Sequence, residues 1–115
     1  MIRCSLEQTP SGKWLRYTAK GHSDHAASGY DIVCAAVSVL GSTCVNSLEA
    51  CCGIKVEFSA NDVGILSFAL PERLNEAQSH DAQLLFSAMV QGLRDIAAQY
   101  PKDLQITLTE RRESR

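Results

Sequence analysis

The residue with the clearest chemical potential is Cys34, which closely follows a loop that carries two histidines. The loop from Gly21 to Tyr30 reads GHSDHAASGY, and its histidines are His22 and His25. A cysteine attacks a carbonyl carbon as the thiolate, and it needs a base or an imidazolium partner within hydrogen-bond reach. The spacing therefore suggests nucleophilic catalysis by a Cys–His pair. The alternative interpretation is a packing cysteine near a helix start and an exposed loop histidine.

Among the cysteines, Cys34 has the position that best favours a thiolate. Asp31 directly precedes a run of helical periodicity, which predicts that Asp31 caps a helix whose first residue is Ile32. Cys34 would then lie in the first turn, where unpaired amides and the helix dipole stabilise negative charge. The other cysteines are predicted in a strand, in mid-helix or at a helix end: Cys4, Cys44, Cys51 and Cys52.

His22 is the predicted base. It follows a predicted strand that ends at Lys20, so its backbone origin is expected to be firmer than that of His25 inside the loop. The eleven residues between His22 and Cys34 are enough to bring the imidazole back against the helix. The third histidine, His80, is expected to be exposed at the start of a second helix.

Further residues around the pair are predicted to support it. Ser38 lies one turn after Cys34, where it would line the pocket or bond near the sulfur; a bond to the preceding helical turn is the alternative. Gly21 and Gly29 would let the loop close around a substrate.

The Asp31 carboxylate and the Cys34 backbone amide are also candidates for a role in the site. Asp31 is interpreted first as the helix cap, and orientation of His22 by Asp31 or Asp24 is the second interpretation. The Cys34 amide is a candidate oxyanion donor, a role that competes with capping by Asp31.

The elements that must position these residues follow the order ββαββαβ. Alternating strands are predicted at 1–8, Trp14 to Lys20, Ile54 to Phe58, Val63 to Leu70 and Leu104 to Leu108. Helices are predicted from Ile32 to Cys51, ended by Gly53, and from residue 76 or 80 to Gln99. Because the connections are short, we expect one α+β domain over 1–115, with a largely antiparallel sheet and two layered helices.

Composition and charge narrow the function classes. The chain is 45 % hydrophobic and 21 % charged, with a net charge of −2, so no direct nucleic-acid binding is expected. Five cysteines without a C-x-x-C pair argue against a disulfide framework or a zinc ribbon, and no cofactor is expected. We also expect no membrane contact, because no apolar run is judged long enough to span a bilayer. Without an export signal, a cytoplasmic location is expected.

The block G-H-(x)n-G-x-D-I-V-C-A-A-V-S, carried by Gly21-His22 and by Asp31 to Ser38, resembles the signature of the ribosomal-processing cysteine proteases, the Prp family. The likeness extends over the whole chain in length and in the order of elements. Ser23 replaces an alanine that often follows the G-H pair in the family, and the loop from Ala26 to Ser28 also differs. These differences bear on the loop expected to cover the substrate, and therefore on cleavage preference more than on chemistry.

The resemblance implies a specific activity. Family members are cytoplasmic endopeptidases that remove a short N-terminal extension from large-subunit ribosomal protein twenty-seven, and they are small homodimers. Their Cys–His pair corresponds to Cys34 and His22. The substrate partner implied for this chain is thus a precursor of that ribosomal protein.

Two other classes of function are considered. His22, His25 and Cys34 would be three ligands of a metal-binding module, although their spacing fits no zinc motif and lacks a fourth ligand. Alternatively, the chain would be a non-catalytic, ribosome-associated dimer that uses its apolar helix surfaces as an interface.

Overall fold

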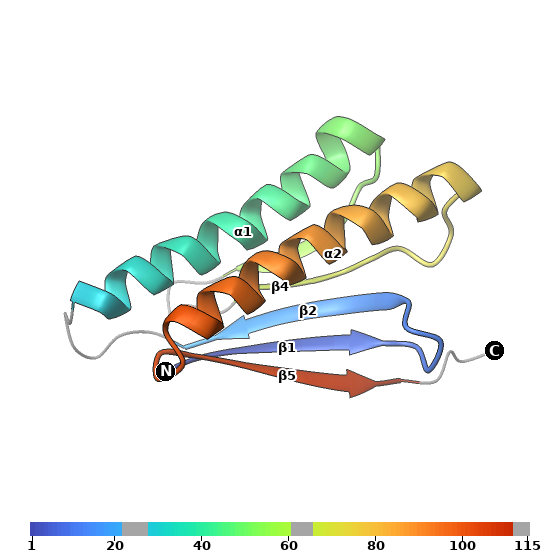
Figure 1. The fold of residues 1–115 in the computed structure, drawn as a ribbon. Helices are drawn as coiled ribbons and strands as arrows, with labels where there is room; N and C mark the ends of the chain where they lie inside the picture. The colour runs from blue at the N-terminus through green and yellow to red at the C-terminus, as the bar shows by residue number, and fades with distance from the viewer. Residues whose placement is uncertain (22–27, 61–65, 112–115) are drawn as a thin grey trace.

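The computed structural model of the protein describes residues 1–21, 28–60 and 66–111. It has two layers, a five-stranded sheet and a pair of long helices that cover one of its faces (Figure 1). The elements are β1 (Ile2–Gln8), β2 (Trp14–Lys20), α1 (Ser28–Cys52), β3 (Glu57–Ala60), β4 (Leu66–Ala69), α2 (Glu76–Gln99) and β5 (Leu104–Glu110). The predicted α+β class and the order ββαββαβ are confirmed.

The strand order in the sheet is β3-β4-β2-β1-β5. The β1–β2, β2–β4 and β3–β4 pairs are antiparallel, and β5 pairs with β1 in parallel. β5 is parallel because α2 carries the chain back along the sheet before the last strand begins. The largely antiparallel sheet is therefore confirmed, with one parallel edge strand.

Buried and exposed side chains alternate along the strands, so one face of the sheet is in the core and the other is open to solvent. In β1, Ile2, Cys4 and Leu6 are buried, whereas Arg3 and Ser5 between them are exposed. Their partners in β2 continue the same face, since Cys4 lies opposite Ala19 and Leu6 opposite Tyr17. A period of two puts one apolar row against the helices and leaves the other face polar.

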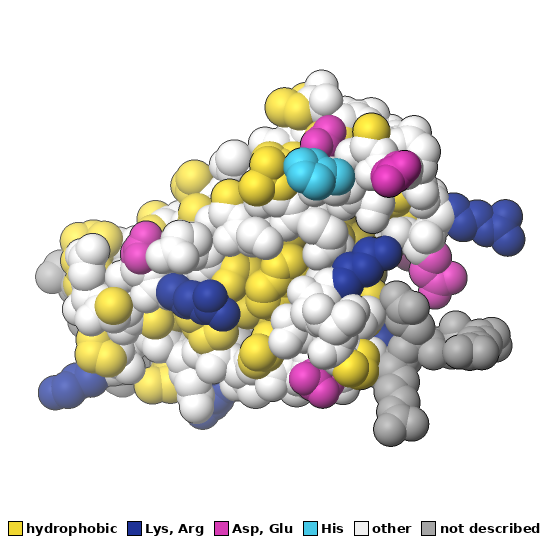
Figure 2. Space-filling view, turned by 45° about the vertical axis from the view of Figure 1, so that its right-hand side comes forward, with side chains coloured by type: hydrophobic (Ala, Val, Ile, Leu, Met, Phe, Trp, Pro, Cys, Tyr) yellow, Lys and Arg dark blue, Asp and Glu magenta, His cyan; other side chains and the backbone are white. Residues whose placement is uncertain are grey.

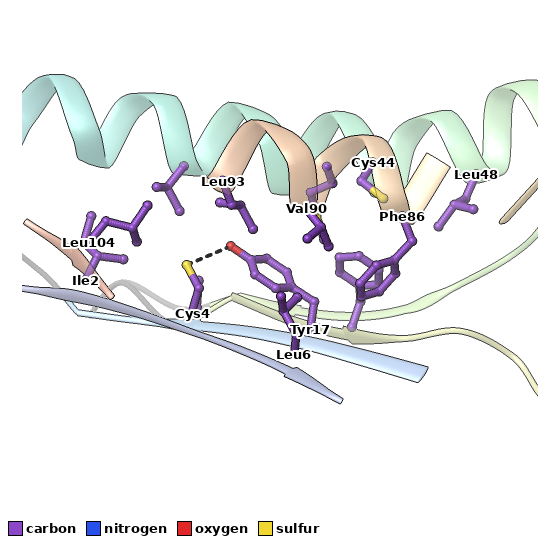
Figure 3. Packing of buried hydrophobic residues seen from close by; sticks show 14 of the residues in the cluster. Ile2, Cys4, Leu6, Tyr17, Cys44, Leu48, Phe86, Val90, Leu93 and Leu104 are labelled. Carbon is purple, nitrogen blue, oxygen red and sulfur yellow. Dashed lines mark hydrogen bonds between the residues drawn. The ribbon is translucent and has the colours of Figure 1, made fainter. Parts of the chain in front are cut away.

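An aromatic cluster fills the space between the sheet and the helices. Phe86 of α2 is fully buried, and its ring lies 5.2 Å from Trp14 in a stacked pair and 5.7 Å from Phe68. Tyr17 meets Phe68 edge-on at 5.7 Å, and its hydroxyl lies 3.4 Å from the Cys4 sulfur (Figure 3). These rings join β2, β4 and α2 into one core.

The start of α2 is defined by local sequence and then tied to the sheet. Asn75 accepts a hydrogen bond from the Gln78 amide while the Gln78 side chain accepts one from the Asn75 amide, a reciprocal capping box. About two turns after Asn75, the Gln83 side chain bonds to the backbone of Trp14. Its oxygen accepts from the Trp14 amide at 2.7 Å, and its nitrogen donates to the Trp14 carbonyl at 2.9 Å. Of the two predicted starts, residues 76 and 80, the structure confirms 76.

The two helices approach closely where a side chain is missing. A Cβ atom at Gly92 of α2 would lie 2.8 Å from a methyl carbon of Leu40 on α1. Leu40 thus occupies the space that glycine leaves, and this contact brings the helices together.

The described bounds of the third and fourth strands differ from the predicted ones. β3 begins at Glu57 rather than Ile54, because Ile54 is buried directly after the end of α1 and its amide bonds the Leu48 carbonyl. β4 is described from Leu66, and residues 63–65 of the predicted strand lie outside the described residues.

The expectation that no apolar segment is long enough to cross a bilayer is wrong by length and composition. Ile32–Cys52 of α1 meets both criteria. One side of this helix nevertheless packs on the sheet, and Val33 and Leu48 near its two ends are fully buried. A core helix of a folded domain can pass the same test.

Replacement of Phe86 by alanine is expected to destabilise the fold by about 3–5 kcal/mol, because it opens a cavity in the middle of the aromatic cluster. The matched control is Leu84→Ala on the same helix, where the side chain is 61 % exposed and little burial is lost. Urea unfolding followed by circular dichroism measures both. Equal midpoints for the two variants would contradict the assigned core.

Candidate active site

The first helix begins earlier than predicted. α1 starts at Ser28, so Asp31 lies inside it and is not the N-cap. Cys34 is consequently the seventh helical residue, in the second turn rather than the first. Sequence reasoning missed this because Asp31 is a favourable cap type, whereas the helix extends back through Ser28 and Gly29.

This earlier start changes the environment of the Cys34 backbone. The unpaired amides of an α-helix are the first four, and the amide of its seventh residue pairs within the helix. The Cys34 amide therefore lacks the free donor capacity that an oxyanion hole requires, and the dipole effect on its sulfur is weaker than predicted.

The end of β2 and the start of α1, which flank the histidine loop in sequence, lie at the same end of the molecule (Figure 1). β2 ends at Lys20 and leads into Gly21 at the same end at which α1 begins (Figure 1). Cys34 is partly buried against the core beside the fully buried Val33, and is neither sealed nor freely exposed. His22, Asp24 and His25 lie outside the described residues.

Three of the other cysteines are held in the neutral thiol form. Burial raises the pKa of Cys4, against a smaller lowering by the Tyr17 hydrogen bond. Burial also raises the pKa of Cys44 to about 11. For Cys52, burial and the nearby Asp81 carboxylate raise the thiol pKa. Because the thiolate is the nucleophile, these three are poor candidates.

Cys34 and Cys51 remain, and they differ in their place on α1. Cys51 is exposed in the last turn, where unpaired carbonyls oppose negative charge. Cys34 is nearer the other end of the helix, which is the end at which β2 leads into Gly21 (Figure 1). Position along the helix therefore favours Cys34 over Cys51, and the role of Cys34 as nucleophile stays a prediction.

Gly21 has a role that the sequence did not reveal. Its φ is +128°, and a Cβ atom there would lie 2.5 Å from the Met1 carbonyl oxygen and 3.0 Å from the Ile2 Cα. Only glycine allows this close contact between the end of β2 and the start of β1. The contact holds the residue immediately before His22 against the backbone, whereas loop mobility had been predicted for Gly21.

The remaining supporting positions have mixed outcomes. Gly29 lies in the first turn of α1 and not in the loop, which corrects its predicted placement, while its role in loop closure stays a prediction. Ser38 is exposed one turn after Cys34, as its spacing requires, and its bond near the sulfur stays a prediction. Within the described ranges, no group of three or more His, Cys, Asp or Glu side chains is arranged to hold a metal ion.

A groove lies at the other end of the sheet. It encloses about 890 Å³ and is lined by residues that include Trp14, Leu70 and Leu74, with Lys13 and Lys55 at its margin. Figure 2 looks toward this end and shows a hollow with hydrophobic side chains in it and basic side chains to either side. Trp14 begins β2 while Gly21 follows its end, so this groove is remote from Cys34.

A thiol at the start of a long helix, layered on a mixed sheet, is compatible with a cysteine protease, and comparison with known proteins places the chain in that class. A family model described as cysteine protease Prp matches residues 1–105. The chain therefore belongs to the Prp family of cysteine proteases.

Individual relatives agree with this assignment over nearly their full length. The chain is 29 % identical over 108 residues to the ribosomal processing cysteine protease Prp of Bacillus subtilis, covering 93 % of this chain and 96 % of the relative. For the Prp of Staphylococcus aureus strain Mu50 the identity is 26 % over 106 residues, with 92 % and 97 % covered.

Solved structures share the fold. SMU.848 from Streptococcus mutans superimposes with a TM-score of 0.85 at 28 % identity, covering 96 % of both chains. The S. aureus Prp in complex with a covalently linked product peptide gives a TM-score of 0.80 at 25 % identity, with 94 % of this chain and 99 % of that chain covered.

Replacement of Gly21 by alanine is expected to displace the start of the histidine loop, because the added Cβ collides with the Met1 carbonyl. The control is Gly12→Ala, which also has a positive φ, of 94°, but meets nothing within 4 Å. We expect both variants to bear backbone strain, and only Gly21→Ala to lose more than tenfold in peptide cleavage rate. Equal rates for the two variants would contradict a positioning role for the close contact.

Proposed function

We propose that the chain is an endopeptidase that removes the N-terminal extension of large-subunit ribosomal protein twenty-seven, with Cys34 as nucleophile and His22 as base. The observation that carries the proposal is the match of the Prp family model to residues 1–105, which include both positions. Relatives named ribosomal processing cysteine proteases support the substrate class. The S. aureus structure with a covalently linked product peptide supports covalent catalysis.

The proposed reaction has two stages. His22 accepts the proton of the Cys34 thiol, and the thiolate attacks the carbonyl carbon of the scissile peptide bond. The tetrahedral intermediate collapses as His22 returns the proton to the leaving amine, which leaves an acyl-enzyme on the sulfur. Water, deprotonated by His22, then releases the extension as a carboxylate and regenerates the thiol.

Because Cys34 lies in the second turn of α1, formation of its thiolate has to depend mainly on the histidine. The effect of a helix dipole falls off within the first turn, so the helix end alone stabilises this thiolate weakly. An imidazolium formed by proton transfer within the pair would supply the opposite charge directly. Oxyanion donors are then expected outside the Cys34 amide.

The assembly and location implied by the resemblance are part of the same proposal. The enzyme is taken to act in the cytoplasm as a homodimer, where it meets the newly made ribosomal protein. No cofactor is required by the proposed chemistry, since the sulfur and the imidazole supply both the nucleophile and the proton transfer.

Replacement of Cys34 by alanine is expected to abolish cleavage of the extended ribosomal protein, because no other thiol has the same position. Cys51→Ala is the matched control: it removes an exposed thiol from the other end of the same helix and should retain the wild-type rate. Gel electrophoresis and mass spectrometry of the product measure both. Wild-type cleavage by Cys34→Ala would end the assignment of the nucleophile.

Replacement of His22 by alanine is expected to slow cleavage about 10²–10⁴-fold, the usual contribution of a general base. His80→Ala is the control, since His80 is exposed at the start of α2 and should be dispensable. Circular dichroism checks that both variants are folded. If His25→Ala, and not His22→Ala, produced the loss, the base would have to be reassigned.

A further inference from the structure

The groove at the end of the sheet remote from Cys34 has an apolar floor that comes from three segments of the chain. Trp14 begins β2, Leu70 directly follows β4, and Leu74 precedes α2. Each of these side chains packs against the core and is only partly buried. The groove encloses about 890 Å³, within the range of roughly 300–1,000 Å³ that ligand pockets usually have. Its floor can therefore accept apolar groups of a ligand without a change in the core.

The floor is held in place by contacts within the domain. The Trp14 ring stacks on Phe86, with 5.2 Å between the ring centroids, and its indole N–H donates to the Ser87 hydroxyl at 2.9 Å. The Leu70 amide donates to the Leu15 carbonyl at 2.9 Å. Because the indole N–H is already used, Trp14 offers a ligand apolar ring surface and no donor. The floor is thus preorganised, which lowers the ordering cost of binding.

The lining of the groove is basic, although the chain as a whole carries net negative charge. Four basic and two acidic side chains line the groove, whereas the net charge of the chain is −2. The basic ones are Lys13, Arg16, Lys55 and Arg111, and the acidic ones are Glu57 and Glu72. Arg16 and Arg111 approach the same carboxylate, that of Glu7, at 3.4 and 3.9 Å. The local charge therefore favours a partner that brings negative charge.

We propose that this groove docks a short peptide segment of another protein, one that carries acidic side chains beside apolar ones. Its apolar side chains lie on the floor formed by Trp14, Leu70 and Leu74. Its carboxylates meet the ammonium groups of Lys13 and Lys55 at the margin. Because the groove is remote from the candidate nucleophile, the segment is bound and not cleaved. The failure of this proposal would leave the Cys–His assignment intact.

A nucleic acid fits the groove less well than a peptide does. It carries a negative charge at every nucleotide, so Glu57 and Glu72 in the lining would repel it. One face of the Trp14 ring is covered by Phe86, so the indole cannot insert between two bases. A peptide can place carboxylates at the two lysines and uncharged side chains beside the two glutamates.

The first experiment uses the position of Trp14 in the floor. It is the only tryptophan of the sequence, so its fluorescence emission reports directly on occupation of the groove. The probe is a library of random heptapeptides displayed on phage and selected on the immobilised full chain. We expect the enriched peptides to combine Asp or Glu with apolar residues. Once synthesised, they should shift the Trp14 emission on titration.

Charge reversal then separates this groove from a general attraction between charges. The double variant Lys13→Glu with Lys55→Glu should bind the enriched peptides about tenfold more weakly, because two attractions become repulsions. The matched control is Lys20→Glu with Lys102→Glu, which makes the same change in net charge at exposed positions at the other end of the sheet. Circular dichroism must show that both double variants are folded.

Several results would overturn the proposal. Enriched peptides that bind both double variants equally, or that are basic or uncharged, would do so. A selection that enriches no peptide would have the same consequence, as would binding that leaves the Trp14 emission unchanged. If oligouridylate shifted the emission and the peptides did not, RNA would be the occupant.

Discussion

The packing of two helices onto one face of a single sheet is the constraint on which the rest of the structure depends. The rings of Phe86, Phe68 and Tyr17 join a helix to two strands, and each of these side chains is almost fully buried. Because all the large side chains are used on this face, the opposite face of the sheet can stay polar. The positions of Cys34 and Gly21 follow from this arrangement.

The same constraint explains why the thiols of one chain differ. Cys4 and Cys44 point into the core, where burial keeps them neutral and unreactive. Cys34 is on the buried side of α1 but near its beginning, where the helix reaches the edge of the packed layer. A single helix thus carries a structural cysteine in its middle and a candidate nucleophile near its start.

The two sides of α1 lie in different surroundings, one inside the domain and one at its surface. The side that carries Val33 and Leu48 packs on the sheet and α2. The outward side, which carries Ile32 and Val39, has no charged residue between Asp31 and Glu49, which is unusual for a helix at the surface. Small residues on both sides allow close approach, as Gly41 does beneath Leu66 and Tyr17. Packing of one side of α1 inside the domain accounts for part of a composition that resembles a membrane segment.

Residues that are neighbours in the chain are enough to predict the features that depend on short-range interactions. Alternation in β1 and the glycine that ends α1 at residue 53 each involve neighbours along the chain. The nature of the candidate nucleophile was likewise accessible from residue type and spacing around Cys34. Only the tertiary structure decided the parallel pairing of β5 with β1, the start of α1 at Ser28, and the close contact of Gly21 with Met1. These features depend on which distant segments share the core, and local propensities carry no information about contacts between residues far apart in the chain.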